Sequence, residues 1–376
     1  MPRFVSLFLA FFFSFSAHAA LPVPAPPELA ASAWLLIDFN SGKVLAEHNP
    51  DQQVEPASLT KMMTAYVVFK EIAGGHLKLS DQVTISEKAW RTGGSKMFIE
   101  VGNQVRVEDL LKGLIIQSGN DAAVALAEFV AGDETTFAHL MNRHAERLGL
   151  TNTHFVNATG LPDPEHLTTA HDLAVIATAL VHDFPEHYGW HAIKEYEWNG
   201  IRQFNRNKLL WRDSTVDGIK TGHTEAAGYC LVASAEREGM RLISVVLGTA
   251  SDKARADANQ TLLNYGFRFY NTRRVFSGGE RLEDTKVWKG DSDNLPVGIA
   301  NDLWATVSRR QFQDLKSEMS LNAKLIAPIA EGQEVGTLKL MLGEDVVAER
   351  PLIALRPIAE GGFFTRLRDS IKLWFE

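Results

Sequence analysis

The order in which two hydrophobic periodicities alternate constrains the fold of this chain more than any other feature. Residues 33–47 alternate like a β-hairpin around a turn at residues 40–42. Apolar residues at helical spacing then occupy the segments 58–72, 107–117, 121–130 and 169–181. Strand patterns return at 218–221, 229–235 and 241–247, before a last helix over 251–265. We therefore predict an α/β (α+β) domain in which strands from both ends of this region form one antiparallel sheet flanked by helices.

The pattern changes again after residue 271. Short alternating runs, separated by Gly, Asp and Pro, occupy segments such as 303–307, 323–326 and 336–342. They predict a small all-β domain over 272–357. The final residues, 358–376, return to helical spacing, with one apolar residue, Leu373, out of register. The large apolar residues of this predicted face are Phe363, Phe364, Leu367, Ile371, Trp374 and Phe375.

An amphipathic C-terminal helix of this kind has two interpretations. It could be a terminal helix docked on the β domain, or it could lie in the surface of a membrane with its aromatic side down. We favour the membrane surface, because so many large aromatic residues at a chain end are unusual without a partner.

The N-terminus has the pattern of a secretory signal peptide. Arg3 is followed by a nearly continuous apolar run from Phe4 to Phe15, and residues 17–19 fit a small-x-small cleavage site. The apolar run is too short to span a bilayer comfortably, so we predict cleavage after residue 19.

Composition excludes several classes of protein. The net charge is −8, which argues against a dedicated nucleic-acid binder. A single cysteine, Cys230, excludes an intramolecular disulfide and a multi-cysteine zinc site, and its apolar neighbours predict an inert buried thiol. The histidine pairs 139/144 and 182/187 lack the spacing of a metal motif. We expect neither a metal nor a cofactor.

The first motif whose residues could take part in catalysis is Ser58-Leu59-Thr60-Lys61. If Ser58 opens a helix, Lys61 lies one turn later on the same face, within hydrogen-bond reach. A serine needs a neighbouring base to act as a nucleophile, and a desolvated lysine can serve. Alone the motif is weak, because about one such pair is expected by chance in a chain of this length.

Two further motifs are also weak alone. Ser118-Gly119-Asn120 falls in a break between two helices, where Ser118 could relay a proton and Asn120 could hold a substrate amide and orient Lys61. It could equally be a turn with a helix cap. Lys220-Thr221-Gly222 ends a short strand.

The strand that carries this third motif suits a peptide substrate. Its edge can pair with an extended peptide. Lys220 and Thr221 suit a substrate carboxylate, with Lys220 charged and Lys61 neutral. Gly222 keeps the wall of the cleft open, and the backbone N–H of His223 could stabilise an oxyanion.

The conjunction of the three motifs, in this order, is far more specific than any one of them. It is the set typical of class A β-lactamases and penicillin-binding proteins. Ser292-Asp293-Asn294 spells a variant of the second motif, but it follows the lysine triplet and lies in the predicted β domain. We interpret it as a turn.

Longer segments extend the resemblance over nearly the whole chain. They are PASLTKMMTAYVV, GGSKMF, QSGNDAAVALAE, GIRQFNRNKLLW and VDGIKTGHTEAAGYCLVASA. On these residues the chain resembles the D-alanyl-D-alanine carboxypeptidases, low-molecular-mass penicillin-binding proteins of the bacterial periplasm similar to penicillin-binding proteins 5 and 6. The resemblance implies a serine β-lactamase/transpeptidase-like fold and no cofactor.

The resemblance also implies roles and partners. Ser58 would be acylated, with Lys61 as its base, Ser118 as a proton relay, Asn120 as a substrate holder and Lys220 as a carboxylate ligand. Arg206, in Asn-Arg-Asn, matches a family arginine near that carboxylate. The substrate would be a peptidoglycan pentapeptide ending in D-Ala-D-Ala, and β-lactam antibiotics would acylate the same serine. The protein would be periplasmic, attached peripherally to the outer face of the inner membrane.

The expected organisation is a signal peptide at 1–19, a D,D-peptidase domain at 20–271, the β-rich domain at 272–357 and an anchor helix at 358–376.

Three alternative functions remain open. A serine β-lactamase shares the motifs but would end soon after the closing helix. A penicillin-sensing receptor would need a spanning helix or a signalling partner. A wall-binding module with a vestigial enzyme would not need the full motif set.

Overall fold

The computed structural model describes residues 23–322 and 324–375. The predicted signal peptide at 1–19 lies outside these described residues, as does residue 323 of one predicted β run.

A five-stranded antiparallel sheet forms the centre of the N-terminal region. Its order is β2-β1-β9-β8-β7. The strands are β1 (Ala33–Asp38), β2 (Val44–His48), β7 (Val216–Thr224), β8 (Gly228–Arg237) and β9 (Met240–Thr249). The N-terminal hairpin joins the later strands through β1, whose Leu35 lies opposite Val245 of β9. The predicted sheet, with strands from both ends of the region, is confirmed.

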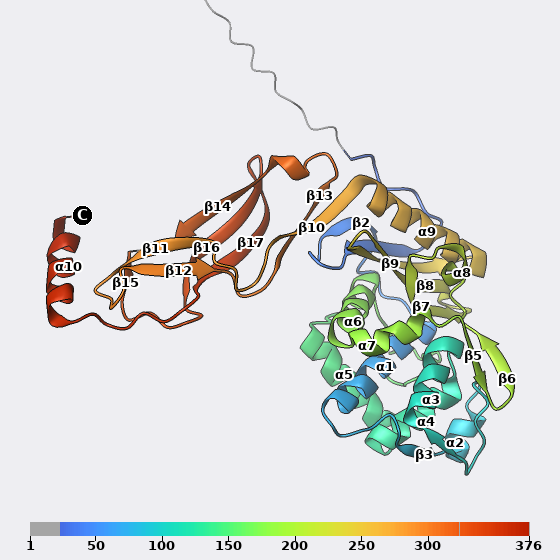
Figure 1. Cartoon of the computed structure of the whole chain (residues 1–376). Helices are drawn as coiled ribbons and strands as arrows, with labels where there is room; N and C mark the ends of the chain where they lie inside the picture. Colours follow the sequence, from blue (N-terminus) through green and yellow to red (C-terminus); the bar gives the residue numbers. More distant parts are fainter. Residues whose placement is uncertain (1–22, 323, 376) are drawn as a thin grey trace, which may run out of the picture.

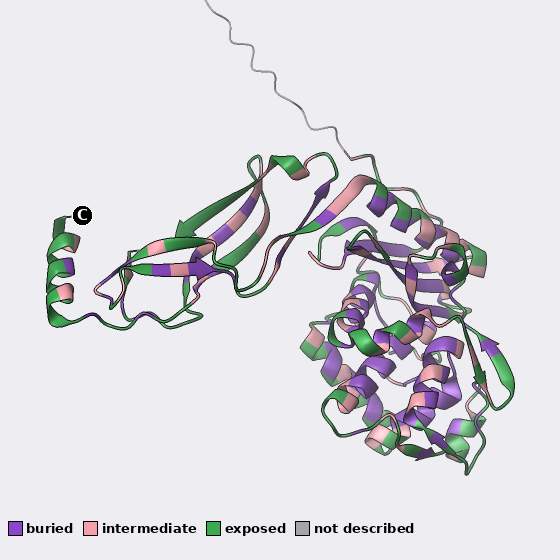
Figure 2. Cartoon of the chain, in the orientation of Figure 1, coloured by how far each residue is buried: buried purple, intermediate pink, exposed green. Residues whose placement is uncertain are grey.

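The alternation of side chains along β1 explains the two layers around the sheet. Leu35 belongs to one hydrophobic core and Leu36 to another, because successive side chains of a strand point to opposite faces. Leu36 shares its core with residues of α9 (Asp252–Phe269), such as Leu262. Leu35 faces the larger helical layer (Figures 1 and 2).

The helical layer lies between β2 and β7 in sequence. Its principal helices are α1 (Thr60–Ala73), α3 (Val107–Lys112), α4 (Asn120–Ala131), α5 (Glu134–Leu148) and α6 (Ala170–Asp183). A 3₁₀ turn, η1 (Ala57–Leu59), precedes α1, and a π-helical turn, η2 (Gly113–Gln117), follows α3. Thr169 caps α6 by accepting a hydrogen bond from the Asp172 N–H, where the sequence predicted the helix to start.

Several short elements of this region were not predicted. A hairpin of β5 (Glu195–Trp198) and β6 (Ile201–Phe204) turns at residues 199–200. The others are β3 (Gln82–Thr84), α2 (Glu87–Arg91), β4 (Gln104–Arg106), α7 (Pro185–Tyr188), η3 (Gly189–Ala192) and α8 (Leu209–Arg212).

A β-rich region with its own hydrophobic core follows α9. Strands β10 (Tyr270–Phe276) and β13 (Leu303–Ser308) pair as a ribbon. A six-stranded sheet has the order β14-β16-β17-β12-β11-β15. Its members are β11 (Glu283–Trp288), β12 (Asn294–Gly298), β14 (Leu315–Leu321), β15 (Leu325–Ile326), β16 (Glu334–Leu342) and β17 (Asp345–Ala354), with the turn η4 (Phe312–Asp314) before β14. The predicted all-β architecture is confirmed.

The last helix, α10 (Phe363–Phe375), lies at the far end of the β-rich region from the central sheet (Figure 1). The helix is therefore separated from the helical layer by the whole length of the β-rich region. Among the described residues, no helix is long and apolar enough to cross a bilayer.

Candidate active site

The Ser-x-x-Lys motif lies where the chain enters α1. Ser58 is on the turn η1, directly after Ala57, whose φ of 48° is left-handed. Such a backbone conformation is costly for a non-glycine residue and tends to occur at functional sites. Gly160 makes room for it, since a Cβ at that position would lie 1.8 Å from the Ala57 carbonyl oxygen.

A buried histidine supports the same turn. Nδ1 of His166 accepts the Val156 N–H at 3.0 Å, so the proton of the neutral ring is on Nε2. Nε2 then donates to Thr60 Oγ1 at 2.8 Å, and Thr60 Oγ1 donates to the Ala57 carbonyl at 2.8 Å. Burial lowers the pKa of His166 to about 4, so this chain of hydrogen bonds keeps its direction at neutral pH.

Lys61 is almost fully buried, and its Nζ has three neighbours. It lies 3.0 Å from Ser58 Oγ, 2.6 Å from Asn120 Oδ1 and 2.6 Å from the Thr159 carbonyl. The two carbonyl oxygens can only accept hydrogen bonds. A neutral amine has two N–H groups for them, and its lone pair then points toward the Ser58 hydroxyl.

The surroundings favour that neutral form. Burial, followed by the positive charge of Arg206, lowers the pKa of Lys61 to about 7, although the Asp121 carboxylate opposes the shift. The predicted pairing of a serine with a deprotonatable lysine one turn away is therefore present in the geometry.

Ser118 and Asn120 lie where α4 begins. Ser118 follows the π-helical turn with a left-handed φ of 68°, and Asn120 is the first residue of α4. Such π turns are often found at functional sites. The Asn120 Nδ2 donates to the Gly93 carbonyl at 2.7 Å, which fixes its Oδ1 toward Lys61. Ser118 Oγ is not hydrogen-bonded to Lys61; it accepts from Lys220 Nζ at 2.8 Å.

Lys220, for which a charge was expected from the sequence, belongs to the same buried cluster. It is buried, and burial, together with the charges of Lys61 and two arginines, moves its pKa well below the ordinary value. Two buried amines in one site cannot both stay protonated without a counter-ion. An anionic ligand next to Lys220 would raise this pKa again.

The third motif lies on β7, the last strand in the sheet order, so one of its edges is unpaired. Thr221 and Gly222 line the cavity together with Ser58. Gly222 packs against the nucleophile turn, since a Cβ there would lie 3.1 Å from the Pro56 oxygen and 3.2 Å from Leu59 Cγ. His223 is exposed at the cavity and stacks on Tyr229 with ring centroids 4.0 Å apart.

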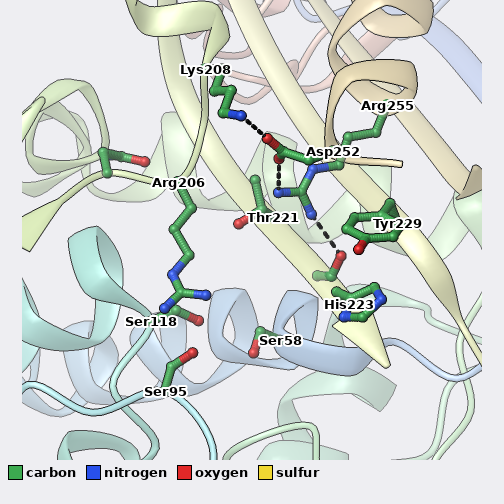
Figure 3. Close-up of a pocket in the computed structure, with 12 residues that line it drawn as sticks. Ser58, Ser95, Ser118, Arg206, Lys208, Thr221, His223, Tyr229, Asp252 and Arg255 are labelled. Carbon is green, nitrogen blue, oxygen red and sulfur yellow. Dashed lines mark hydrogen bonds and ion pairs between the residues drawn. The ribbon is translucent and has the colours of Figure 1, made fainter. Parts of the chain in front are cut away.

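These motifs surround one cavity of about 510 Å³ (Figure 3). Ser58, Ser118, Arg206, Thr221, Gly222 and His223 line it, and Lys61, Asn120 and Lys220 lie buried behind them. All nine residues predicted for the site are therefore brought together. Ser292 and Asp293 lie instead in the bend between β11 and β12, and Asn294 is the first residue of β12; Arg356 donates to Ser292 Oγ at 3.0 Å.

Sequence analysis missed three charged residues that also line the cavity. Arg255 Nη1 donates to the Gly222 carbonyl at 2.9 Å. Its Nη2 forms an ion pair with Asp252, which is also paired with Lys208 (Figure 3). One signal could have revealed Arg255: it falls on the buried face of α9 beside Ala256 and Ala258, where an arginine needs polar partners. Including Lys61 and Lys220, cationic side chains outnumber acidic ones around the cavity.

Two other expectations concern residues outside the motifs. Cys230 is buried in β8, as its apolar neighbours predicted, and burial raises the pKa of its thiol to about 11. Among the described residues, no group of three His, Cys, Asp or Glu side chains could hold a metal ion.

Comparison with known proteins identifies the same two regions. Residues 21–251 match the family described as D-alanyl-D-alanine carboxypeptidase, and residues 270–360 match the C-terminal domain of penicillin-binding protein 5. The D-alanyl-D-alanine carboxypeptidase DacC of Escherichia coli is 46% identical over 373 residues, which cover 97% of this chain and 93% of DacC.

Solved structures agree with these matches. Penicillin-binding protein 5 from Haemophilus influenzae has a TM-score of 0.87 and 40% identity, covering 90% of this chain and 100% of that one. Penicillin-binding protein D2 from Listeria monocytogenes, in its ampicillin-bound form, has a TM-score of 0.59 and 30% identity, covering 64% of this chain and 98% of that one.

Proposed function

This chain belongs to the D-alanyl-D-alanine carboxypeptidase family, and from that membership we propose how its residues carry out the reaction. It is a serine-type D-Ala-D-Ala carboxypeptidase, which removes the terminal D-alanine through an acyl-enzyme. Ser58 is the nucleophile and Lys61 its base. The observation that carries this assignment is the position of Lys61 Nζ, whose two carbonyl partners leave only its lone pair for Ser58 Oγ.

Acylation follows from this geometry. Ser58 Oγ attacks the carbonyl carbon of the penultimate D-alanine while its proton moves to Lys61 Nζ. Backbone N–H groups of Ser58 and His223 stabilise the oxyanion. The peptide C–N bond then breaks, the proton that Lys61 took up is relayed through Ser118 to the departing amine, and an ester on Ser58 and a neutral Lys61 remain.

The cations around the cavity position the substrate. Lys220 and Thr221 bind the terminal carboxylate, with Arg206 beside them, and the carboxylate stabilises the protonated form of Lys220. Asn120 holds a peptide amide. The unpaired edge of β7 takes the extended peptide as an added strand, and Gly222 lets this strand pack closely on the turn that carries Ser58.

Deacylation reuses the same groups. Water attacks the ester carbonyl and gives up its proton to Lys61, the ester C–O bond breaks, and Ser58 recovers its hydrogen. β-Lactams have a reactive amide and a carboxylate that fit the same positions, and penicillin-binding protein D2, similar in fold, is known with ampicillin bound. The physiological substrate is the peptidoglycan pentapeptide ending in D-Ala-D-Ala.

The experiment that tests the assignment is Ser58→Ala with intact-mass spectrometry after penicillin treatment. We expect the wild type to gain one penicillin mass and the variant none, with D-alanine release abolished and the thermal unfolding midpoint nearly unchanged. A penicillin adduct on the variant would place the nucleophile elsewhere. Release of D-alanine together with a slowly released penicillin adduct separates this function from a β-lactamase, which would turn penicillin over rapidly.

We further propose that α10 attaches the protein to a membrane surface. The helix turns Asp369 toward the β-rich region, where the carboxylate accepts the Lys289 N–H at 2.7 Å. Its six large apolar residues are instead exposed by 49–86%: Phe363, Phe364, Leu367, Ile371, Trp374 and Phe375. A helix that docks by its polar side and exposes its aromatic side has the polarity expected at a lipid surface.

The remaining organisation is part of the same proposal. Residues 1–19 act as an export signal, 20–271 form the catalytic domain, 272–357 a stalk and 358–376 the anchor. The protein then works in the periplasm on the outer face of the inner membrane. The separation of α10 from the catalytic cavity along the length of the β-rich region supports this arrangement (Figure 1).

A further inference from the structure

A second cavity, of about 310 Å³, lies at the tip of the β5–β6 hairpin. The proposed reaction assigns no role to the side chains that line it. They include two aromatic rings, one carboxylate and three carboxamides: Phe98, Trp198, Glu100, Asn103, Gln104 and Asn199.

The walls of this cavity continue from those of the catalytic cavity. Ser95 lines the catalytic cavity, and Phe98, three residues later, lines the second one. On the hairpin side, Asn205 lines the catalytic cavity, and Asn199, six residues earlier, lines the second. At about 3.3 Å per residue, six residues of strand cover at most about 20 Å.

The two walls are tied together between the cavities. Gln203 of β6 directs its Nε2 toward the carbonyl oxygens of Lys96 and Met97, at 3.4 and 3.5 Å. The hairpin and the loop that begins at Ser95 therefore form one continuous surface from the nucleophile to the second cavity.

The fold holds an aromatic ring exposed in this cavity. Phe98 is 49% exposed and has a left-handed φ of 71°, which is unusual for a bulky residue. The fully buried carboxylate of Asp121 fixes it by accepting the N–H groups of Met97, Phe98 and Ile99 at 3.0, 2.9 and 3.3 Å. Asp121 is next to Asn120, so the start of α4 positions both the catalytic amide and the exposed ring.

This set of side chains fits a sugar. An N-acetylated sugar ring has an apolar C–H face, which an aromatic ring can cover, and a rim of hydroxyl and acetamido groups. Carboxamides both donate and accept hydrogen bonds, and a carboxylate accepts them, so the polar residues match that rim. Small-molecule sites commonly combine aromatic walls with a few polar groups in this way.

We propose that the second cavity binds an amino sugar of the peptidoglycan strand to which the peptide in the catalytic cavity is attached. A five-residue peptide spans at most about 17 Å when extended, which is compatible with the span of at most about 20 Å between the cavities. The inference rests on the proposed function of the catalytic cavity, and it makes the enzyme prefer peptides that still carry their sugar.

The test compares one pentapeptide ending in D-Ala-D-Ala with the same peptide linked to its N-acetylated amino sugar. For the wild type, kcat/KM is higher for the sugar-linked substrate. Phe98→Ala and Gln104→Ala are made separately. Each reduces the ratio of kcat/KM for the sugar-linked peptide to kcat/KM for the free peptide by about fivefold, which is the effect expected from losing one aromatic contact or one hydrogen bond. The control is Phe129→Ala, which removes a ring that is 40% exposed on α4 and lines neither cavity.

The outcomes separate this inference from the proposed function. Penicillin acylation and thermal unfolding of each variant verify that it is folded. If the wild type shows no preference, or if both variants keep the wild-type ratio, the second cavity is not a sugar site. If the wild type releases D-alanine from neither substrate, it is the proposed function that fails.

Discussion

At the scale of single residues, the proposed mechanism makes acylation depend on the pKa of Lys61. Because burial and Arg206 lower that pKa to about 7, the amine is neutral above pH 7 and protonated below it. Only the neutral form can accept the proton of Ser58. We predict that the rate of penicillin acylation is level above about pH 7 and falls with decreasing pH below it, about tenfold per pH unit. Stopped-flow acylation of a fluorescent penicillin between pH 5 and 9 measures this profile, and a profile flat down to pH 5 would exclude Lys61 as the base.

Lys61→Arg tests the same residue at fixed pH. An arginine keeps a positive charge but cannot lose its proton. We expect acylation to slow by about 10²–10⁴-fold, the usual contribution of a general base. The assay is penicillin labelling at pH 8, and acylation at a rate near that of the wild type would show that the base lies elsewhere.

His166 is a positioning residue, since it acts on Ser58 through Thr60 and the Ala57 carbonyl. Because the pKa of His166 is about 4, its ring is neutral over the pH range in which Lys61 gains or loses its proton. We predict that His166→Ala slows acylation at every pH without moving the inflection near pH 7. A shift of that inflection would mean that His166 takes part in the proton transfer itself.

At the scale of elements, Asp121 joins the start of α4 to the loop at Met97–Ile99. An asparagine there cannot accept all three N–H groups, so Asp121→Asn should destabilise the protein by about 2–4 kcal/mol in urea unfolding. Hydrogen exchange at these amides should also become faster.

The same substitution has an electrostatic consequence for catalysis. The Asp121 carboxylate raises the pKa of Lys61, so its removal should move the acylation inflection to lower pH. Asp133→Asn is the matched control, because Asp133 caps α5 by accepting the Thr136 N–H and does not contribute to the Lys61 shift. An unmoved inflection in Asp121→Asn would contradict this coupling.

At the scale of the whole molecule, a buried polar cluster joins the central sheet to the β10–β13 ribbon. The Asp38 carboxylate, fully buried at the end of β1, accepts from Ser41 and from Thr272 Oγ1, and Thr272 contacts Thr306 at 2.8 Å. Asp38→Ala removes the carboxylate to which both hydroxyls donate. We predict that limited proteolysis near residue 270 becomes faster while penicillin acylation keeps its rate, because the junction lies outside the catalytic cavity. Unchanged proteolysis would show that this cluster does not hold the two regions together.

The membrane proposal belongs to this scale as well. A chain that ends at Glu360 should remain in the soluble periplasmic fraction and still release D-alanine from small peptides. In the full chain, Trp374→Glu should weaken binding to phospholipid vesicles, whereas Leu321→Glu, in an exposed apolar position of β14, should not. If the truncated chain stays with the membrane, α10 is not the anchor.

The sequence alone determined the order of the elements and the chemistry of the site. Periodicity revealed the sheet and the β-rich region because each strand has to bury one face, and the three motifs identified Ser58, Lys61, Asn120 and Lys220 because their residue types suit acyl transfer. The β5–β6 hairpin was missed although a local signal for it exists: the alternating residues Glu195–Trp198 are followed by Asn199-Gly200, a typical two-residue hairpin turn.

Only the tertiary structure decided which groups meet. Ser118 is hydrogen-bonded to Lys220, which is 102 positions away in the sequence, and not to Lys61. The charge of Lys61 lowers the pKa of Lys220 because both amines are buried close together. Arg255 reaches the cavity because α9 packs against β8 and β9, which brings its Nη1 to the Gly222 carbonyl of β7. The helix α10 was recognisable as amphipathic from its sequence, but the structure decided that Asp369 is buried and the aromatic face exposed. The spacing of residues in the sequence determines which side chains share one face of a helix or strand. Tertiary packing determines whether that face contacts the core, another domain or the surroundings of the protein.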